Sequence, residues 1–193
     1  MLHFYALFEY LSVGRETNPY MISIMTYKAS MDNAAKGITA GVSVLFAVII
    51  IAQFSLIPQT GWIIPVCVTA GLVIIYIVLF GFKPAGYRIT EKEITIRRLF
   101  GDVQIDRQQI KSITVIDREE LRWSLRLFGV GGVFGYFGTF ANRKIGKMTW
   151  YATRRNTPVL LITIENKKII LTPDDPVQFV AVFERLGKTT ILL

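Results

Sequence analysis

The stretch "GITAGVSVLFAVIIIAQFSLIPQTGWIIPVCVTAGLVIIYIVLFGF", residues 37–82, contains no Asp, Glu, Lys or Arg in 46 residues. A bilayer core is about 30 Å thick, and a helix needs roughly 20 apolar residues to cross it. The stretch is therefore long enough for two crossings and a turn. A helical hairpin buried in a soluble core is disfavoured, because the stretch is too long and too uniformly apolar.

The two crossings are separated by "PQTG", residues 58–61, where a helix breaker and a glycine favour a turn. In lipid each backbone polar group must be satisfied within its own segment, so helices are predicted. They are expected over residues 38–57 and 62–82, within a two-helix transmembrane hairpin of residues 36–82.

Flanking charge predicts the orientation of this hairpin. The basic residues nearest its two ends are Lys28, Lys36, Lys83, Arg88 and Lys92, whereas the connecting turn has no charged residue. By the positive-inside rule, both termini and the C-terminal part are expected in the cytoplasm.

The segment before the hairpin, residues 1–35, lacks a clear signature. Residues 1–20 have neither the basic start nor the continuous apolar stretch of a signal peptide. Two interpretations stay open. The segment is a short amphipathic helix, or translation begins at a later methionine, Met21, Met25 or Met31, and residues 1–20 are not part of the true protein.

After the hairpin, residues 83–193 form a predicted β domain. Short runs rich in β-branched and aromatic residues alternate with turn residues, as in a compact β fold. These runs are residues 86–90, 94–100, 103–105, 110–116, 147–153, 158–164 and 168–172. They predict about seven strands.

The end of the chain predicts one amphipathic helix. In "TPDDPVQFVAVFERLGK", Asp174 is a candidate N-cap, Asp175 and Pro176 suit the first turn, and Gly187 is a candidate terminator. One face is apolar and consists of Phe179, Val180, Phe183 and Leu186. The helix is expected to cap an open end of the sheet.

The order of these parts resembles that of bacterial pleckstrin-homology-like (PH-like) domain proteins with an N-terminal two-helix membrane hairpin. The resemblance is carried by "RLFGVGGVFGYFGTFANRKIGKMTWYATRRNTPVLLIT", residues 126–163, and by "LTPDDPVQFV", residues 171–180. It implies a mainly β domain, a partly open barrel or sandwich capped by a C-terminal α-helix. It also implies a bacterial inner-membrane protein linked to protein interaction, with no catalytic residues to carry over.

The glycine-rich stretch at residues 126–143 invites a phosphate-binding interpretation, which its spacing excludes. G-x-G-x-x-G after Gly129 and Gly131 needs glycine where Phe134 stands, and Gly146-Lys147 lacks the Ser or Thr of a P-loop. Tight turns and strand are expected instead, with the aromatic residues in the core. Contact of these aromatics with the membrane interface stays open.

Neither a metal, a cofactor nor a catalytic site is expected. The sole histidine is His3, and the sole cysteine, Cys67, lies in a predicted span, so zinc-ligand spacing and a nucleophile–base pair are both missing. The acidic group Asp117, Glu119 and Glu120 is predicted to lie on a solvated loop.

Basic residues are the most suggestive feature of the C-terminal part. Residues 83–193 contain 19 Lys/Arg and 11 Asp/Glu, and therefore carry the whole net charge of +8. The anionic cytoplasmic leaflet attracts each basic residue near its surface by about 1 kcal/mol. The candidate contact patch for lipid or partner is Arg143, Lys144, Lys147, Arg154 and Arg155. No nucleic-acid recognition module is evident.

The sequence therefore predicts a non-enzymatic, membrane-anchored interaction module for a protein partner or anionic lipid headgroups. The alternative is a structural or assembly subunit that forms homo-oligomers through the hairpin or the sheet. A membrane-linked enzyme is the least favoured interpretation.

Overall fold

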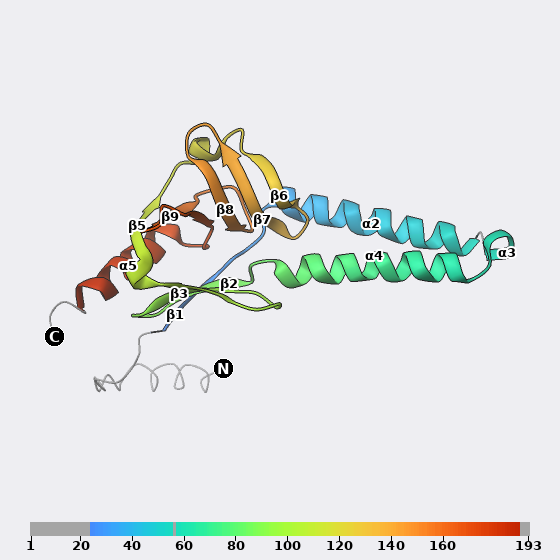
Figure 1. The fold of residues 1–193 in the computed structure, drawn as a ribbon, viewed down its shortest axis with the longest axis horizontal. Helices are drawn as coiled ribbons and strands as arrows, with labels where there is room; N and C mark the ends of the chain where they lie inside the picture. Colours follow the sequence, from blue (N-terminus) through green and yellow to red (C-terminus); the bar gives the residue numbers. More distant parts are fainter. Residues whose placement is uncertain (1–23, 56, 190–193) are drawn as a thin grey trace, which may run out of the picture.

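The computed structural model describes residues 24–55 and 57–189, and it shows a long helical hairpin projecting from a β-rich domain (Figure 1). Residues 1–20, for which two interpretations were open, lie outside the described residues. The hairpin consists of α2 (Asn33–Ser55), a single turn α3 (Ile57–Thr60) and α4 (Ile63–Phe82). The predicted fold class, an apolar helical hairpin joined to a mainly β domain with a C-terminal helix, is confirmed.

Both long helices of the hairpin are long and apolar enough to cross a membrane. In the most apolar window of each, 0% and 6% of the residues are buried, so neither helix is part of the core of the described domain. Between the helices, Ser43 Oγ and Tyr76 OH lie 2.8 Å apart. The Phe46 and Tyr76 rings also meet there, at a centroid distance of 6.3 Å.

Helix α2 begins five residues before the predicted residue 38, at Asn33. The reason is the side chain of Asp32, whose Oδ1 accepts a hydrogen bond from the Ala35 N–H at 2.7 Å. Such a cap satisfies one of the N–H groups that a helix leaves unpaired at its start. The helix therefore extends beyond the apolar run into the domain.

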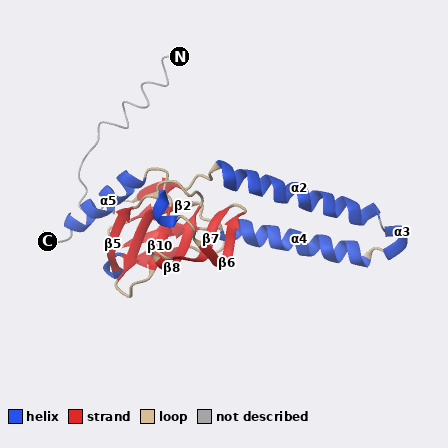
Figure 2. Cartoon of the chain, turned by 90° about the horizontal axis from the view of Figure 1, so that it is seen from above, coloured by secondary structure: helices blue, strands red, loops and turns tan. Residues whose placement is uncertain are grey.

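The β domain contains two sheets, and Figure 2 shows them stacked beside the helices. The first has the order β1-β2-β3-β4 and the second β5-β9-β10-β8-β7-β6. The strand bounds are Met25–Lys28 (β1), Gly86–Ile89 (β2), Glu93–Arg97 (β3), Val103–Asp106 (β4), Ile110–Val115 (β5), Leu125–Gly132 (β6), Gly135–Asn142 (β7), Gly146–Ala152 (β8), Val159–Thr163 (β9) and Lys168–Leu171 (β10). The pairing of β10 with β8 is parallel, and every other described strand pair is antiparallel. Two 3₁₀ turns, η1 (Arg107–Gln109) and η2 (Arg118–Leu121), flank β5.

The main core lies between the two sheets and is closed by α5 (Pro176–Thr189). Tyr87 on β2 and Phe179 on α5 are fully buried there. Tyr87 OH donates to the Tyr151 carbonyl at 2.6 Å and accepts from the Thr172 N–H at 3.0 Å, which ties the first sheet to the second. Burial raises the pKa of the Tyr87 phenol to about 12, against the opposing effect of the Thr172 hydrogen bonds.

Three strands, β1, β6 and β7, lie outside the seven runs predicted from the sequence. Strand β1 comes before the hairpin and pairs with β2, so the domain is built from chain on both sides of the membrane helices. Its Tyr27 ring contacts Phe179 at a centroid distance of 5.1 Å. The domain boundaries at residues 36 and 83 stay a prediction, and a fragment starting at residue 83 would lack β1.

The other two strands outside the predicted seven, β6 and β7, are the glycine-rich stretch itself, where turns and strand were expected without bounds. These two strands form a β-hairpin. Gly129 lies opposite Gly138, and Gly132 lies opposite Gly135. The four glycines that recur at every third position of the sequence therefore form two cross-strand pairs. At Gly129, φ is +108°, and a Cβ there would lie 2.3 Å from the Phe137 carbonyl oxygen. The glycines therefore serve close backbone approach rather than ligand binding.

The start of α5 differs from the prediction. Asp175, not Asp174, is the capping residue, since its Oδ1 accepts from the Gln178 N–H at 2.9 Å. Asp174 instead accepts hydrogen bonds from Ser30 N and Oγ at 2.9 and 2.6 Å. Gly187 does not terminate the helix, which continues to Thr189.

Candidate functional site

The β6–β7 turn packs on the two apolar helices at their ends nearest the domain (Figures 1 and 2). Phe134 in this turn is 6% exposed, and its ring centroid lies 5.0 Å from that of Tyr76 and 5.3 Å from that of Phe80. Its backbone N–H donates to Thr39 Oγ1 at 2.8 Å. One aromatic residue thereby fixes the turn to both helices.

The β3–β4 turn contacts the same end of α4. The Phe100 N–H donates to the Gly81 carbonyl at 3.0 Å, and its ring lies 5.8 Å from that of Phe82. A Cβ on Gly81 would lie 2.2 Å from the Phe100 ring, so the glycine provides the space for it. The Arg98 guanidinium lies 5.6 Å from the Phe82 ring centre.

Large apolar side chains on the β3–β4 turn and on β6 are left exposed. Leu99, Leu127 and Phe128 are between 59% and 79% exposed, and we call them the hairpin-side surface. Figures 1 and 2 both place β6, the edge strand of its sheet, at the side of the domain that faces the helices. Exposed apolar groups beside a membrane span are typical of a surface that contacts the bilayer interface.

Basic residues accompany this surface. Arg98 adjoins Leu99, and Arg126 adjoins Leu127. Lys83, directly after α4, has its Nζ 4.5 Å from the Phe80 ring centre. Arg126 pairs with Phe140 and Phe128 with Thr139, so Arg126 and Phe128 lie on opposite faces of β6. A basic residue near the anionic leaflet contributes about 1 kcal/mol on either face of this edge strand.

The five predicted contact residues lie at the two ends of β8. Arg143, Lys144 and Lys147 are in or beside the β7–β8 turn, whereas Arg154 and Arg155 follow the other end of the strand. The strand has seven residues and therefore separates the groups by about 20 Å. The structure does not bring the five together, and their role in binding stays a prediction.

Three of these five residues have partners within the chain. The Arg154 guanidinium pairs with Asp174 at 3.2 Å and also donates to the Pro173 carbonyl. The Lys144 ammonium pairs with Glu120 at 3.2 Å. The Arg155 guanidinium lies 4.5 Å from the Tyr136 ring centre. Arg154 in particular is only 19% exposed, so we assign it a structural role.

The carboxylate of Asp174 is the ion-pair partner that holds the Arg154 side chain in its structural role. Burial raises the pKa of the Asp174 carboxyl, but the Ser30 hydrogen bonds and the charge of Arg154 outweigh it, and the pKa lies below its usual value. The carboxylate thus holds the segment after β1 against the start of α5.

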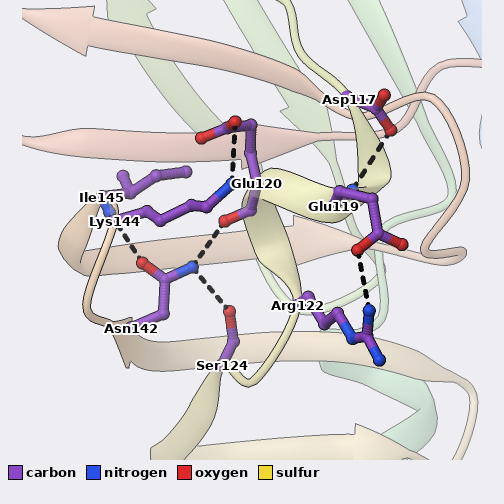
Figure 3. A network of polar contacts seen from close by, with 8 residues as sticks. All are labelled: Asp117, Glu119, Glu120, Arg122, Ser124, Asn142, Lys144 and Ile145. Carbon is purple, nitrogen blue, oxygen red and sulfur yellow. Dashed lines mark hydrogen bonds and ion pairs between the residues drawn. The ribbon is translucent and has the colours of Figure 1, made fainter.

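The acidic group at residues 117–120 is largely solvent-exposed, as predicted, and it is part of a polar network (Figure 3). Asn142 is at its centre, where its Nδ2 donates to the Glu120 carbonyl at 2.7 Å and to Ser124 Oγ at 3.2 Å. Asn142 Oδ1 accepts from the Ile145 N–H at 2.7 Å. One side chain therefore fixes η2 and the residues after it to the β7–β8 turn.

Two cavities adjoin this network. The first, of about 590 Å³, is lined by Arg118, Glu119, Leu121, Arg122, Trp123, Ser124, Phe140, Trp150 and Arg155. The second, of about 720 Å³, is lined by Glu119, Arg122, Trp123, Leu125, Ala141, Asn142, Arg143 and Lys144. Glu119, Arg122 and Trp123 are common to both.

The described residues hold no group of three or more His, Cys, Asp or Glu side chains that suits a metal ion. Sequence reasoning missed the hairpin-side surface and the first cavity. The signal for the surface was present in "RRLFGD", residues 97–102, where two large apolar residues occupy a turn. The cavity had no such signal, because its lining comes from residues 118–124, 140, 150 and 155.

The comparisons with known proteins agree with this architecture. The family model described as "Bacterial PH domain" matches residues 85–186. No curated protein and no solved structure matches the chain.

Proposed function

The chain belongs to the bacterial PH domain family, and from that premise we propose that it is a non-enzymatic interaction module held on the cytoplasmic face of a bacterial cell membrane. The hairpin anchors the domain, and the domain rests on the bilayer through the hairpin-side surface. There it binds anionic lipid headgroups.

The observation that best supports this proposal is that two turns of the domain pack against the helices. Phe134 and Phe100 fix the β6–β7 and β3–β4 turns to α2 and α4, which sets the domain in one orientation to the helices. Leu99 on the β3–β4 turn and Leu127 and Phe128 on β6 remain exposed. A tether of this kind raises the effective concentration of the domain at the surface, so weak headgroup contacts suffice.

The cytoplasmic orientation is part of the proposal and rests on charge. The basic residues that flank the hairpin, among them Lys36 and Lys83, lie at the domain end of both helices, whereas the α3 turn has none. The positive-inside rule then favours the domain end as the cytoplasmic one. Digestion of the domain by protease added outside intact cells would contradict this orientation.

The proposal is tested on the full chain, extracted with its surrounding lipid into polymer nanodiscs. The ratio of anionic to zwitterionic lipid in the particles is measured by mass spectrometry. Arg98→Gln with Arg126→Gln is expected to lower that ratio. The control, Lys111→Gln with Lys167→Gln, removes the same charge from exposed positions on β5 and the β9–β10 turn and should leave the ratio unchanged.

An equal ratio in both double variants would contradict headgroup binding by this surface. A second pair, Arg143→Gln with Lys144→Gln, tests the predicted contact patch in the same way. The same nanodisc particles test the alternative function, which is assembly into oligomers. Strand β6 is one of the two edge strands of its sheet, and such an edge is able to pair with a second copy. Native mass spectrometry of the particles would then show a homo-oligomer or a protein partner.

A further inference from the structure

We propose that the surface around Trp123 is a docking site for a protein partner whose contacting segment is acidic and presents a large apolar side chain. This Trp123 surface consists of Trp123 and Leu125 together with Arg118, Arg143 and Arg155, which line the two adjoining cavities. The site goes beyond the proposed bilayer contact, because it includes no residue of the hairpin-side surface.

Two large apolar side chains of the Trp123 surface lie in solvent. Trp123 is 82% exposed and Leu125 is 72% exposed, and both line the second cavity. They lie at the start of β6, whereas the β6–β7 turn that packs on the helices lies at the other end of the strand. The eight residues of β6 separate these two ends by about 25 Å. The contact with the helices therefore leaves Trp123 uncovered.

The backbone presents the Trp123 ring from a strained but fixed position. Its φ is +59°, in the left-handed region that a bulky side chain rarely adopts. The next residue is held in place, because Ser124 Oγ donates to the Leu121 carbonyl at 2.7 Å and accepts from Asn142 Nδ2 (Figure 3). Strain of this kind gathers at functional sites, where the surrounding structure holds it. A side chain in a fixed frame also loses little freedom when a partner binds.

The charge of this surface indicates the chemistry of the partner. The lining of the two cavities contributes five basic residues and one acidic residue, Glu119, which pairs with Arg122 at 3.2 Å. Within the described part of the chain, Arg118, Arg143 and Arg155 form no ion pair. An acidic segment complements these charges, whereas a second copy of this chain would place like charges opposite one another. The charge therefore favours an acidic partner over a homodimer.

The shape of the surface suits a side chain on each side of Trp123. Trp123 and Arg122 line both cavities, and the Arg122 guanidinium lies 5.6 Å from the Trp123 ring centre. Tryptophan and arginine are enriched among the residues that dominate the binding energy of protein interfaces. A large apolar residue of the partner would pack on Trp123 and Leu125, and carboxylates on either side of it would pair with the arginines.

The first experiment selects a library of random peptides displayed on phage against the full chain in phosphatidylcholine nanodiscs. Empty nanodiscs remove the peptides that bind lipid. We expect the enriched peptides to combine Asp or Glu residues with a large apolar residue. No enrichment over empty nanodiscs, or enrichment of neutral or basic peptides alone, would overturn the proposal.

The affinity of the most enriched peptide for the full chain is then measured by fluorescence anisotropy. Trp123→Ala, and Arg118→Gln with Arg155→Gln, are each expected to weaken the affinity at least about tenfold, as for the loss of an interface hot spot. The matched control is Phe128→Ala, which removes a 79% exposed aromatic side chain from β6 and should leave the affinity within about twofold. Equal affinities in Trp123→Ala and Phe128→Ala would contradict the site. Because Phe128 belongs to the hairpin-side surface, this test is independent of the bilayer contact.

Two further measurements separate binding from folding and from membrane contact. Glycine adopts a positive φ without strain, so Trp123→Gly should unfold at no lower temperature than Trp123→Ala and yet bind the peptide as weakly. A bilayer is the competing occupant of an exposed tryptophan. Quenching of tryptophan fluorescence by brominated lipid, present in Trp62→Phe and lost when Trp123→Ala is added, would assign this surface to the membrane and overturn the proposal.

Discussion

Gly138 offers the sharpest test of how the glycine-rich stretch folds. It faces Gly129 across β6 and β7, and its φ is +123°. A Cβ there would lie 2.3 Å from the Phe128 carbonyl oxygen, which is closer than any real Cβ contact. Gly131, on the same hairpin, has an ordinary φ, and a Cβ there would meet only the flexible side chain of Arg126 at 3.5 Å.

Alanine at residue 138 therefore carries two costs. The unfavourable φ costs about 1–3 kcal/mol. The clash also forces the strands apart, and each hydrogen bond lost between them costs about 1 kcal/mol. The sum is about 3 kcal/mol, or a fall in Tm of roughly 6–12 °C for a chain of this size.

The assay is thermal unfolding of the full chain in nanodiscs, followed by tryptophan fluorescence. Gly138→Ala is compared with Gly131→Ala, the matched change in the neighbouring strand. We expect Gly131→Ala to unfold within about 2 °C of the native chain, since its cost is a few tenths of a kcal/mol. Equal Tm values for the two variants would refute the steric account of the repeat.

Three further perturbations follow from the contacts of the domain. Tyr87→Phe is expected to cost about 1–3 kcal/mol, because the Thr172 N–H and the Tyr151 carbonyl lose their partner in the core. Since the raised pKa of Tyr87 disfavours its ionised form, stability of the native chain should fall as pH rises from about 10 to 12, and urea titrations would show this loss absent in Tyr87→Phe. Asp174→Asn should lower stability at neutral pH. The lowered carboxyl pKa contributes stability above its usual value of 3.8 that is lost below it, so the variant should show a flatter acid profile. Phe134→Ala should cost about 3–5 kcal/mol, and an unchanged Tm in nanodiscs would show that the β6–β7 turn is not seated on the helices.

Elements with a strong local signal were predicted well from the sequence. The uncharged run marks the helical hairpin, and alternation in "PVLLITI" marks β9, in which Val159, Leu161 and Thr163 are the buried residues. The N-cap was placed one residue early because Asp174 and Asp175 have the same local chemistry. Only the position of Ser30, 144 residues away in the chain, makes Asp174 its partner.

Features that depend on distant partners were beyond sequence reasoning. Strand β1 has four residues and joins a sheet whose next strand begins after the whole hairpin. The five predicted basic residues are close in sequence, yet β8 separates them because a strand extends by about 3.3 Å per residue. The first cavity brings residues 118–124 to Trp150 and Arg155 across the face of a sheet, and no local pattern records that contact.

The central claim is that the domain rests on the bilayer through the hairpin-side surface. Its most direct test is a set of single labelled cysteines in a Cys67→Ala background, placed at Leu99, Phe128 or Ile164. All three side chains are exposed. The Ile164 N–H donates to the carbonyl of Gln109, the last residue of η1, and Arg107 of the same turn contacts α5. Each cysteine carries a nitroxide spin label, and the chain is placed in nanodiscs of anionic lipid. The collision rates of the nitroxide with oxygen and with a water-soluble nickel complex then report how deeply the label lies in the bilayer. The account predicts interfacial immersion at residues 99 and 128 and water exposure at residue 164. Water exposure at all three would contradict it.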